Sequence, residues 1–300
     1  MTRIVAIVEN EGEFTRDLMH AGQSKEVEII AARWQDLGVS LFEGRETIRC
    51  QQTVLNNADV VLLRTLRRSS FEQVFFRMDV IQRLEAMGII VVNPARAIEI
   101  AVDKYLSLSI LQDNGLPIPD TFTCQTYEDA MVSFDKLGGD VVVKPMFGAQ
   151  GFGMARITDR ALAQRAFSQL EQMGSISYIQ RFISHPGADL RLFVLGDMVL
   201  AAMRRHSREG EWRCNISQGG YAKAINPDPT ISDMAIQAAR SCQAVIAGVD
   251  IIIDHNDQPY ILEVNPIPGW KALGMATGID ITGQLVAFLI HLAEERHVHI

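Results

Sequence analysis

Apolar positions follow two different periods along the first third of the chain. Four short apolar runs predict buried strands: RIVAIV (3–8), EVEIIAA (26–32), DVVLLR (59–64) and GIIVV (88–92). Residues 71–87 instead place apolar side chains at helical spacing, from Phe71 through Met78 to Leu84. Because strands that alternate with helices form parallel sheets, the pattern predicts an α/β fold with a doubly wound parallel sheet.

The rest of the chain mixes helices with hairpins, which is typical of an α+β arrangement. Asn93-Pro94 is a turn signal and separates residues 1–93 from residues 94–300. Helices are predicted over 96–114, 127–137, 159–173 and 282–295, with one more that begins at Ser232 and ends at Gly248. Strands are predicted over 141–145, 177–183 and 189–206, and in a last hairpin over 249–265.

Composition narrows the class of protein. The 300 residues carry 28 Lys and Arg against 36 Asp and Glu, and this net charge of −8 argues against a nucleic-acid partner. The four cysteines lie far apart, without C-x-x-C or Cys/His spacing, which favours a reducing compartment over structural zinc. No run approaches the roughly 20 apolar residues of a membrane helix, and the N-terminal run is too short for a signal peptide. The sequence therefore predicts a cytoplasmic globular protein with no membrane partner.

Two acidic residues face each other across the last predicted hairpin. If residues 255–258 form its loop, Asp250 pairs with Glu263, and Asn265 points to the same face as Glu263. Directly paired side chains lie about 5 Å apart, so two carboxylates repel there, and burial raises the cost. A divalent cation turns this repulsion into coordination, and carboxylate and amide oxygens suit magnesium. The alternative, a partly solvated polar face, explains the pairing less well because it would separate like charges.

A lysine interrupts an apolar strand just before a glycine-rich segment. Lys144 ends VVVK and is followed by FGAQGFG, which contains Gly148, Gln150, Gly151 and Gly153. Glycines let backbone N–H groups approach phosphate oxygens, and a nearby ammonium group adds positive charge. The segment is neither a Walker loop nor a dinucleotide fingerprint, because it lacks G-K-[ST] and a strand follows it. Taken alone, it fits an ordinary hairpin turn equally well.

Other polar residues gain meaning only from their order along the chain. Lys104, Arg205, Arg213 and Asn215 would each by themselves be solvated surface residues. Together the chain presents lysine, lysine, glycine-rich loop, arginine and asparagine, and then the paired acids. This order favours a phosphate site over scattered surface charges.

That order resembles the ATP-grasp superfamily, and specifically the RimK-like amino-acid ligases, over residues 94–290. The resemblance is carried by VVVKPMFGAQGFG, DLRLFVLGDMVLAAMRRHSREGEWRCNISQGG, AGVDIIID and ILEVNPIPGWKALGMATGIDI. Residues 1–93 match more weakly, through DVVLLR and GIIVVNPARAIEIAVDK. The resemblance implies an ATP-grasp fold with an N-terminal pre-ATP-grasp domain at 1–93. A central subdomain would follow at 94–183, and a C-terminal subdomain with the metal site at 184–300.

The resemblance also implies which residues hold ATP. Its phosphates or adenine end would contact Lys104 and Lys144, and a flap over the phosphates would contain Gly148, Gln150, Gly151 and Gly153. The ribose region would contact Asp189. Relatives carry Gln-Glu-aromatic on the strand that touches adenine, whereas this chain has Gln180-Arg181-Phe182. The adenine contact would then fall to the backbone of Arg181 and Phe182.

Catalytic and metal-binding roles follow from the same resemblance. Residues near the transferred phosphoryl group would be Arg191, Arg205 and Asn215, with Arg213 beside the nucleotide. The magnesium ligands would be Asp250, Glu263 and Asn265, in agreement with the hairpin argument.

The implied activity is that of an ATP-dependent, ADP-forming carboxylate–amine ligase. ATP would convert a carboxylate into an acyl phosphate with the help of two divalent ions, Mg²⁺ or Mn²⁺, and an amine would then displace phosphate. Relatives add glutamate to a ribosomal protein tail, a pterin or deazaflavin cofactor, or a carrier protein, and NPIPGWKAL is most similar to the pterin branch. The expected partners are an amino acid and a small carboxylate acceptor, and the resemblance implies a homo-oligomer.

Two other classes of function stay open. A degenerate ligase that only senses nucleotides would lose its metal ligands freely, so the presence of Asp250, Glu263 and Asn265 argues against it. A dinucleotide-dependent oxidoreductase would need a G-x-G-x-x-G loop after the first strand, where this chain has ENEGEF.

The acceptor site is predicted at the carboxyl ends of the N-terminal strands, where ligands bind in open α/β sheets. Arg64 ends DVVLLR, and Arg67 and Arg68 follow in the adjoining loop. Three arginines on an acidic protein form a local anion trap, and arginine pairs well with planar carboxylates. The alternative is a solvated loop, in which case the acceptor would contact the segment around Trp270 and Lys271.

Overall fold

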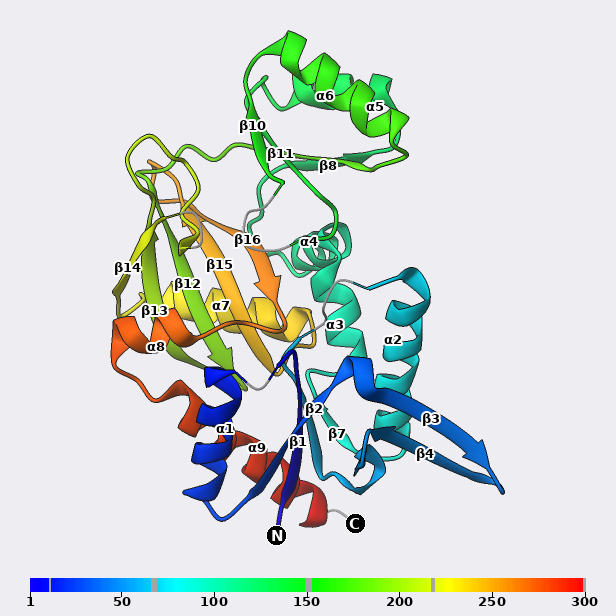
Figure 1. Ribbon diagram of the computed structural model, residues 1–300. Helices are drawn as coiled ribbons and strands as arrows, with labels where there is room; N and C mark the ends of the chain where they lie inside the picture. The colour runs from blue at the N-terminus through cyan, green and yellow to red at the C-terminus, as the bar shows by residue number, and fades with distance from the viewer. Residues whose placement is uncertain (11, 66–68, 149–152, 217–218, 299–300) are drawn as a thin grey trace.

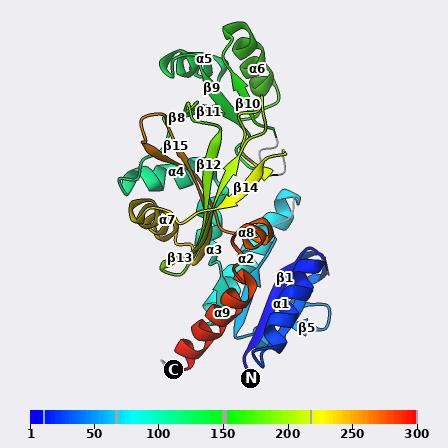
Figure 2. The same cartoon turned by 90° about the vertical axis from the view of Figure 1, so that its left-hand side faces the viewer.

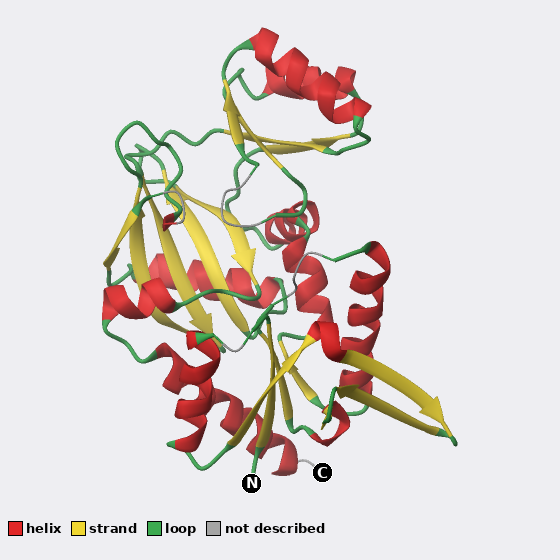
Figure 3. Cartoon of the chain, in the orientation of Figure 1, coloured by secondary structure: helices red, strands yellow, loops and turns green. Residues whose placement is uncertain are grey.

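In the computed structural model, three larger sheets follow one another along the molecule, each with its own helices (Figure 1). The structure describes residues 1–10, 12–65, 69–148, 153–216 and 219–298. The N-terminal sheet lies at one end and the middle part of the chain at the other, with the C-terminal sheet between them (Figures 2 and 3).

The N-terminal sheet is parallel, as the alternation of strands and helices predicted. Its strand order is β2 (Glu28–Arg33), β1 (Arg3–Val8), β6 (Val60–Leu63) and β7 (Ile90–Val92). Side chains alternate between two buried faces, which is why these strands are almost wholly apolar. One face packs against α2 (Phe71–Ala86) and α3 (Ala95–Val102). The other packs against α1 (Glu13–Gln23) and α9 (Ile281–Val298).

Helix α9 comes from the far end of the chain. Its Leu285, Val286 and Leu289 share one core with Ile4 of β1 and with Phe193 and Met203 of the C-terminal sheet. Figure 2 shows α9 beside α1 at the N-terminal end of the molecule. The C-terminal helix therefore ties the first and last parts of the chain together, while the domain boundaries stay predictions.

A small antiparallel sheet projects from the N-terminal unit and was not predicted. It consists of β3 (Leu37–Phe42), β4 (Arg45–Cys50) and β5 (Thr53–Val54), flanked by the short 3₁₀ turns Trp34–Asp36 and Leu55–Asn57. Glu43 and Gly44 turn the hairpin with positive φ. The β3–β4 arm extends away from the rest of the molecule (Figure 1).

The middle of the chain forms an antiparallel sheet covered on one face by two helices. The strand order is β10 (Ala155–Ile157), β9 (Val141–Lys144), β11 (Ser177–Arg181) and β8 (Thr121–Cys124). Helices α5 (Tyr127–Lys136) and α6 (Arg160–Gln172) pack on it through Phe134 and Phe167. Their N-caps, Thr126 and Asp159, accept hydrogen bonds from the first turn of each helix. The uncovered face is turned toward the C-terminal sheet (Figure 1).

The C-terminal sheet is antiparallel, in the order β14 (Tyr221–Ala224), β13 (Met198–His206), β12 (Ala188–Leu195), β15 (Ile246–Ile253) and β16 (Pro259–Asn265). Helix α7 (Pro229–Ser241) covers one face. On the opposite face, the front face, α8 (Lys271–Thr277) and the N-terminal unit cover only the end that holds Phe193 and Met203. The rest of the front face carries polar side chains.

Two predicted helices have different limits. The segment 96–114 is two helices, because the Asp103 carboxylate accepts hydrogen bonds from the N–H groups of Tyr105 and Leu106 and starts α4 (Lys104–Asp113). Helix α7 begins at Pro229 after its cap Asp228, not at Ser232, and ends at Ser241. Among the described residues no single helix is long and apolar enough to cross a membrane, and α8 with α9 would qualify only as a pair bent by 114°.

Candidate functional site

A row of polar side chains lies on the front face of β12. Leu190 and Leu192 pack under α7, so the residues that alternate with them, Asp189, Arg191 and Phe193, face the other way. The strand register places Asp189 opposite Arg205 of β13, and Arg191 opposite Asp250 of β15. The residues expected around the phosphoryl group and the metal are thus neighbours on one face of one sheet.

These four charged residues form a single buried network. Arg205 donates from Nε and Nη2 to the two carboxylate oxygens of Asp189, both at 2.7 Å, and Nη2 also lies 3.0 Å from Asp250 Oδ2. Arg191 Nη1 donates to Asp250 Oδ1 at 2.6 Å. Two acids and two arginines balance each other, so the desolvation of each charge is offset by a partner. In this structure Asp189 is engaged by Arg205, whereas the resemblance assigned it to the ribose.

Glycine at position 248 makes room for Arg191. A Cβ atom on Gly248 would lie 2.7 Å from Nε of Arg191 and closer still to the rest of its guanidinium group. The prediction that Gly248 ends a helix is wrong, because this glycine lies inside β15, opposite Phe193. Its role is close approach of a side chain to a strand backbone.

Asp250 faces Glu263 as predicted, but the hairpin reaches that pairing through a β-bulge. Ile253, not Asp254, pairs with Pro259, and the register shifts by one residue between Asp250 and Ile251. Leu262 is the extra residue, so Ile261 and Val264 both pack under α7. Leu262 and Glu263 therefore both belong to the front face. A strict alternation would have turned one of them into the core.

The two acids differ in their surroundings. Burial alone would raise the pKa of Asp250, but Arg191 and Arg205 outweigh it and hold that pKa below its usual range. Burial and the Asp250 carboxylate raise the pKa of Glu263. Within the described residues the Glu263 carboxylate makes no hydrogen bond or ion pair. A carboxylate without a partner beside a second carboxylate is a fitting place for a cation.

The donor set suits magnesium that is shared with phosphate groups. Asn265 lies two residues beyond Glu263, and its Oδ1 accepts a hydrogen bond from the N–H of Ile267 at 2.9 Å. The described residues contain no cluster of three or more His, Cys, Asp or Glu side chains arranged for a metal. Two carboxylates and an amide oxygen leave positions for water and nucleotide oxygens, which is the usual way magnesium is held.

Two lysines lie above this face. Lys144, at the end of β9, donates to Gln180 Oε1 at 2.5 Å, and burial lowers the pKa of its ammonium group to about 8 even though Glu263 raises it. Lys104, the first residue of α4, donates to the carbonyl oxygens of Met146 (3.3 Å) and Gly148 (3.0 Å). The lysines therefore flank the start of the glycine-rich segment. Gly148 and Gly153 are described, whereas Gln150 and Gly151 lie outside the described residues.

A cavity opens between the middle sheet and the C-terminal sheet. Its apolar walls come from opposite sides, with Val142 and Met154 on one and Ile252 and Leu262 on the other. Apart from Ile183 and Cys214, the rest of its lining is polar or aromatic: Lys144, Gln180, Arg181, Phe182, His185, Asp189, Trp212, Arg213 and Asn215. Apolar walls on two sides with polar groups around them suit the planar base of a nucleotide, and the cavity is called the base cavity below.

Arg181 and Arg213 are held at the rim of this cavity by acids. Arg181 forms an ion pair with Asp120, and its N–H donates to the Asp120 carbonyl at 2.9 Å. Arg213 lies 2.8 Å from the Glu211 carboxylate, which its hydrogen bond helps to hold at a pKa of about 2. The guanidinium group of Arg156 lies 3.6 Å from the centre of the Phe182 ring. Arg181 thus has an acidic partner of its own where relatives carry Glu.

A side chain that the sequence presented only as a turn joins the N-terminal unit to this site. Asn93 is 1% exposed, and its Nδ2 donates to the carbonyls of Ile246 (2.6 Å) and Pro266 (2.5 Å). Its Oδ1 accepts from the N–H groups of Val245 and Ile246. Asn93 therefore connects the edge of the parallel sheet to the start of β15 and to Pro266, just after β16. These strands form the hairpin of Asp250 and Glu263, the acidic hairpin. Only the place of Asn93 next to a boundary proline hinted at this role.

Of the residues expected at the acceptor site, Arg64 and Trp270 are in contact. Arg64 follows β6, and its guanidinium carbon lies 4.1 Å from the centre of the Trp270 ring. Trp270 is buried, and its indole N–H donates to Thr282. Lys271 forms an ion pair with Glu13. Arg67 and Arg68 lie outside the described residues.

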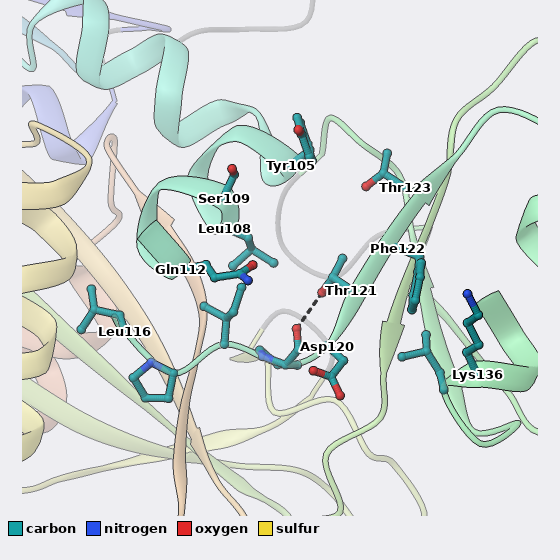
Figure 4. Close-up of a pocket in the computed structure, with 14 residues that line it drawn as sticks. Tyr105, Leu108, Ser109, Gln112, Leu116, Asp120, Thr121, Phe122, Thr123 and Lys136 are labelled. Carbon is teal, nitrogen blue, oxygen red and sulfur yellow. Dashed lines mark hydrogen bonds between the residues drawn. The ribbon is translucent and has the colours of Figure 1, made fainter. Parts of the chain in front are cut away.

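A larger cavity, of about 860 Å³, lies on another side of the middle sheet (Figure 4). Tyr105, Ser109 and Gln112 of α4 face it from one side, and Thr121 and Thr123 of β8 from the other. None of the paired acids, and neither Lys104 nor Lys144, is among its lining residues. Its size therefore does not make it the catalytic centre.

Comparisons with known proteins agree with this geometry. Residues 101–289 match the family described as the RimK-like ATP-grasp domain, and residues 3–98 match the RimK PreATP-grasp domain. The chain is 31% identical over 284 residues to a probable alpha-L-glutamate ligase 1 of Hahella chejuensis, covering 94% of this chain and 92% of that protein. It is 29% identical over 316 residues to the tetrahydromethanopterin:alpha-L-glutamate ligase of Methanosarcina acetivorans, covering 95% and 97%.

Solved structures show the same fold. The ATP-grasp ligase PsnB complexed with minimal precursor, Mg and ADP superposes with a TM-score of 0.76 at 21% identity, covering 97% of this chain and 98% of that one. The D-alanine–D-alanine ligase of Bacillus anthracis complexed with ATP gives 0.70 at 19% identity, with full coverage of both chains. The expected ATP-grasp fold is confirmed.

Proposed function

This chain belongs to the RimK-like ATP-grasp ligases, which are ATP-dependent and ADP-forming, and we propose that it joins glutamate to a carboxylate of a small pterin-like cofactor. One observation carries the proposal at this site. Glu263, whose carboxylate has no partner among the described residues, and Asp250, which Arg191 and Arg205 hold, lie on one face, beside a cavity that Lys144 helps to line. The choice of acceptor rests on the named activity of the Methanosarcina relative and on the run NPIPGWKAL.

The chemistry needs a better leaving group on the acceptor. A carboxylate resists attack because oxide would have to leave, whereas an acyl phosphate loses phosphate readily. The bond from the γ-phosphorus to its bridging oxygen breaks, ADP leaves, and the acceptor oxygen forms the new bond to phosphorus. The amine of glutamate then attacks the acyl carbon, phosphate departs, and the amine proton is lost.

The residues of this chain contribute position and charge. In the proposal, Lys104 and Lys144 bind phosphate oxygens, Asn215 and Arg213 lie beside the nucleotide, and the cavity orients the base. Arg191 and Arg205 supply positive charge where the phosphoryl group is transferred, and they also fix the Asp250 carboxylate. Closure of the middle sheet over the front face would exclude water, so that the acyl phosphate meets the amine first.

Asp250, Glu263 and Asn265 are proposed to hold two divalent ions, Mg²⁺ or Mn²⁺. When bound, these ions neutralise phosphate charge and fix the direction of transfer. Asp250 already has two guanidinium partners, so its carboxylate is oriented before any ion arrives. Glu263 has none among the described residues, and it is the group whose electrostatic cost an ion relieves.

Two alternative functions determine how the test is designed. A ligase of the same family could instead modify a protein tail or a carrier protein, and a degenerate ligase could bind nucleotide without turnover. The test is ADP release in a panel that crosses amino acids with a reduced pterin carboxylate, a deazaflavin cofactor and a glutamate-ended peptide. We expect ADP only when glutamate, the pterin acceptor and Mg²⁺ are present together, with a product heavier by one glutamyl residue.

Each other outcome is informative. Turnover with the peptide alone would move the assignment to protein modification. Nucleotide binding without ADP release across the whole panel would favour the sensor.

We also propose that the chain self-associates, as the resemblance implied. Leu41 and Phe42, at the tip of the β3–β4 arm, are 80% and 69% exposed. Phe71 and Phe75, at the start of α2, are also exposed, and their ring centres lie 4.5 Å apart with the planes tilted by 60°. Apolar surface of this kind is a common mark of an interface. Sedimentation of the wild type and of Phe42→Ser tests it, and a wild type that stays monomeric at every concentration contradicts it.

A further inference from the structure

The side chain of Arg64 lies where three parts of the chain meet. Its backbone N–H continues the parallel sheet by donating to Ile7 at 2.9 Å, and its Nη2 donates to the Pro268 carbonyl at 2.8 Å. Pro268 lies three residues beyond Asn265, in the segment that follows the acidic hairpin. Arg64 thus reaches from the carboxyl end of β6 to the chain that leaves the proposed metal site.

The positive charge of Arg64 has no counter-charge within the described residues. The contact with Pro268 is its only side-chain hydrogen bond there, and it forms no ion pair. Its Nε has no accessible surface and no partner. Glu13, the residue before Phe14, is paired with Lys271. A partly buried cation without an anion is costly, and burial lowers the pKa of Arg64 to about 9.

Two aromatic rings hold the guanidinium group in place. Its central carbon lies 4.1 Å from the centre of the Trp270 ring and 4.6 Å from that of Phe14. The two rings contact each other edge to face, at 4.6 Å and 63°. Trp270 in turn packs on Phe193, with ring centres 5.7 Å apart. Such contacts favour a cation but do not neutralise it, so the guanidinium group is oriented and has no anion beside it in the part of the chain that the structure describes.

A series of side-chain contacts shows where the guanidinium group of Arg64 lies relative to the charged residues on β12. Phe193 follows Arg191 by two residues on the front face, a step of about 7 Å along a strand. Trp270 packs on Phe193, and Arg64 packs on Trp270. Arg64 therefore lies beyond Arg191, at the end of the front face that is away from the base cavity. A substrate that reacts beside Arg191 would extend from there toward Arg64.

We propose that Arg64 binds a carboxylate of one of the two substrates that the ligase joins, with Phe14 and Trp270 as positioning residues. This inference rests on the proposed function for the identity of the ligand. Arginine presents paired N–H donors in a plane, which match a carboxylate. Within the described residues Nη1 has no hydrogen-bond partner and Nη2 uses one of its two N–H groups on Pro268, so the Nη1–Nη2 edge is left for a ligand, whereas Nε is covered. The acceptor and glutamate both carry carboxylates, so the kinetic arm of the test tells them apart.

The competing view is that Arg64 is a structural link between β6 and the Pro268 segment. The two views predict opposite effects on stability. If Arg64 is a structural link, replacing it lowers the stability of the protein. If it is a partly buried cation without a counter-charge, replacing it leaves the stability equal or higher. Arg64→Met keeps much of the aliphatic length and packing but removes the charge and the donors.

The first measurement uses binding without turnover. Glutarate, at constant ionic strength against a NaCl control, is titrated into the wild type, Arg64→Met and Arg64→Lys, with thermal unfolding as the readout. Arg96→Met is the matched control, because Arg96 is an exposed arginine paired with Glu99 on α3. We expect glutarate to raise the Tm of the wild type and the control but not of Arg64→Met. Arg64→Met without ligand should melt at or above the wild-type temperature.

The second measurement separates the two substrates. With ATP saturating, KM is measured for each co-substrate in turn. We expect Arg64→Met to raise KM by about tenfold for the substrate whose carboxylate it binds, with the KM of ATP unchanged. Arg64→Lys, which keeps the charge but loses the planar fork, should show a smaller rise.

The inference is overturned if glutarate shifts the Tm of Arg64→Met as it does that of the wild type. A lower Tm for Arg64→Met, with unaltered glutarate response, identifies a structural link. If Arg64→Met does not fold, Arg64→Lys decides the same comparison. Because the glutarate arm needs no turnover, it can succeed even if the proposed ligase reaction is not found.

Discussion

The backbone of Gly248 lies directly against the guanidinium group of Arg191, on the neighbouring strand. A Cβ atom at this position would come within 2.7 Å of Arg191 Nε. Arg191 also donates to Asp250 at 2.6 Å. The absence of a side chain at Gly248 therefore determines where the Asp250 carboxylate is held. The ionic network and the strand backbone are therefore packed as one unit.

Gly248→Ala should displace Arg191 and loosen Asp250. We expect a loss of about 1–3 kcal/mol in the free energy of unfolding, as for other overpacked sites, and a fall in kcat larger than the change in ATP affinity. Urea unfolding and steady-state ADP release measure the two effects. Gly38→Ala is the control, because a Cβ there meets nothing within 4 Å. Equal behaviour of the two variants would show that Arg191 does not depend on Gly248.

Substitutions of the two acids among the proposed metal ligands should differ in their effect on stability, although each should abolish ligation. Asp250→Asn leaves Arg191 and Arg205 without their shared partner, so it should lower the free energy of unfolding by roughly 3–5 kcal/mol. Glu263→Gln removes a carboxylate that has no partner among the described residues and whose pKa burial and Asp250 raise, so it should leave stability equal or higher. Thermal unfolding with and without MgATP gives both quantities. Full activity in either variant would remove that residue from the metal site.

Lys144→Met should weaken ATP binding or turnover severely. Lys144 is buried beside Gln180 at the entrance to the glycine-rich segment, so its charge acts on phosphates in a site poor in water. Nucleotide titration and the KM of ATP measure the effect, with the exposed Lys25→Met as control. From the sequence alone we expect Gly151→Val to act likewise, by blocking close approach of the backbone. A segment that tolerates Val with unchanged kinetics would be only a hairpin turn.

Asn93→Ala should detach the N-terminal unit from the acidic hairpin. The change leaves buried N–H and carbonyl groups of Val245, Ile246 and Pro266 without partners, at a cost of at least about 2 kcal/mol. Urea unfolding measures this loss, and Asn114→Ala, at an exposed helix end, is the control. An Asn93→Ala protein as stable as this control would show that other contacts carry the junction.

The local features of this protein follow from its sequence. The parallel sheet was predictable because period and run length distinguish buried strands such as residues 3–8 from the helix at 71–86, without reference to distant residues. The pairing of Asp250 with Glu263 was predictable because a hairpin brings together residues close in sequence. The ATP-grasp resemblance was legible for a similar reason, since its motifs are short runs that place lysines, glycines and acids in a set order.

Contacts between distant segments were decided only by the tertiary structure. Nothing local indicates that Asp250 shares Arg205 with Asp189, that Asn93 holds β15, or that α9 packs on the first sheet. The bulge at Leu262 also depends on the tertiary structure. It lets Ile261 and Val264 face α7 while Leu262 faces the base cavity. Arg64 illustrates the division. Its place at a strand end could be read from the sequence, but whether its charge has a partner depends on every segment that folds around it, and only the folded chain brings those together.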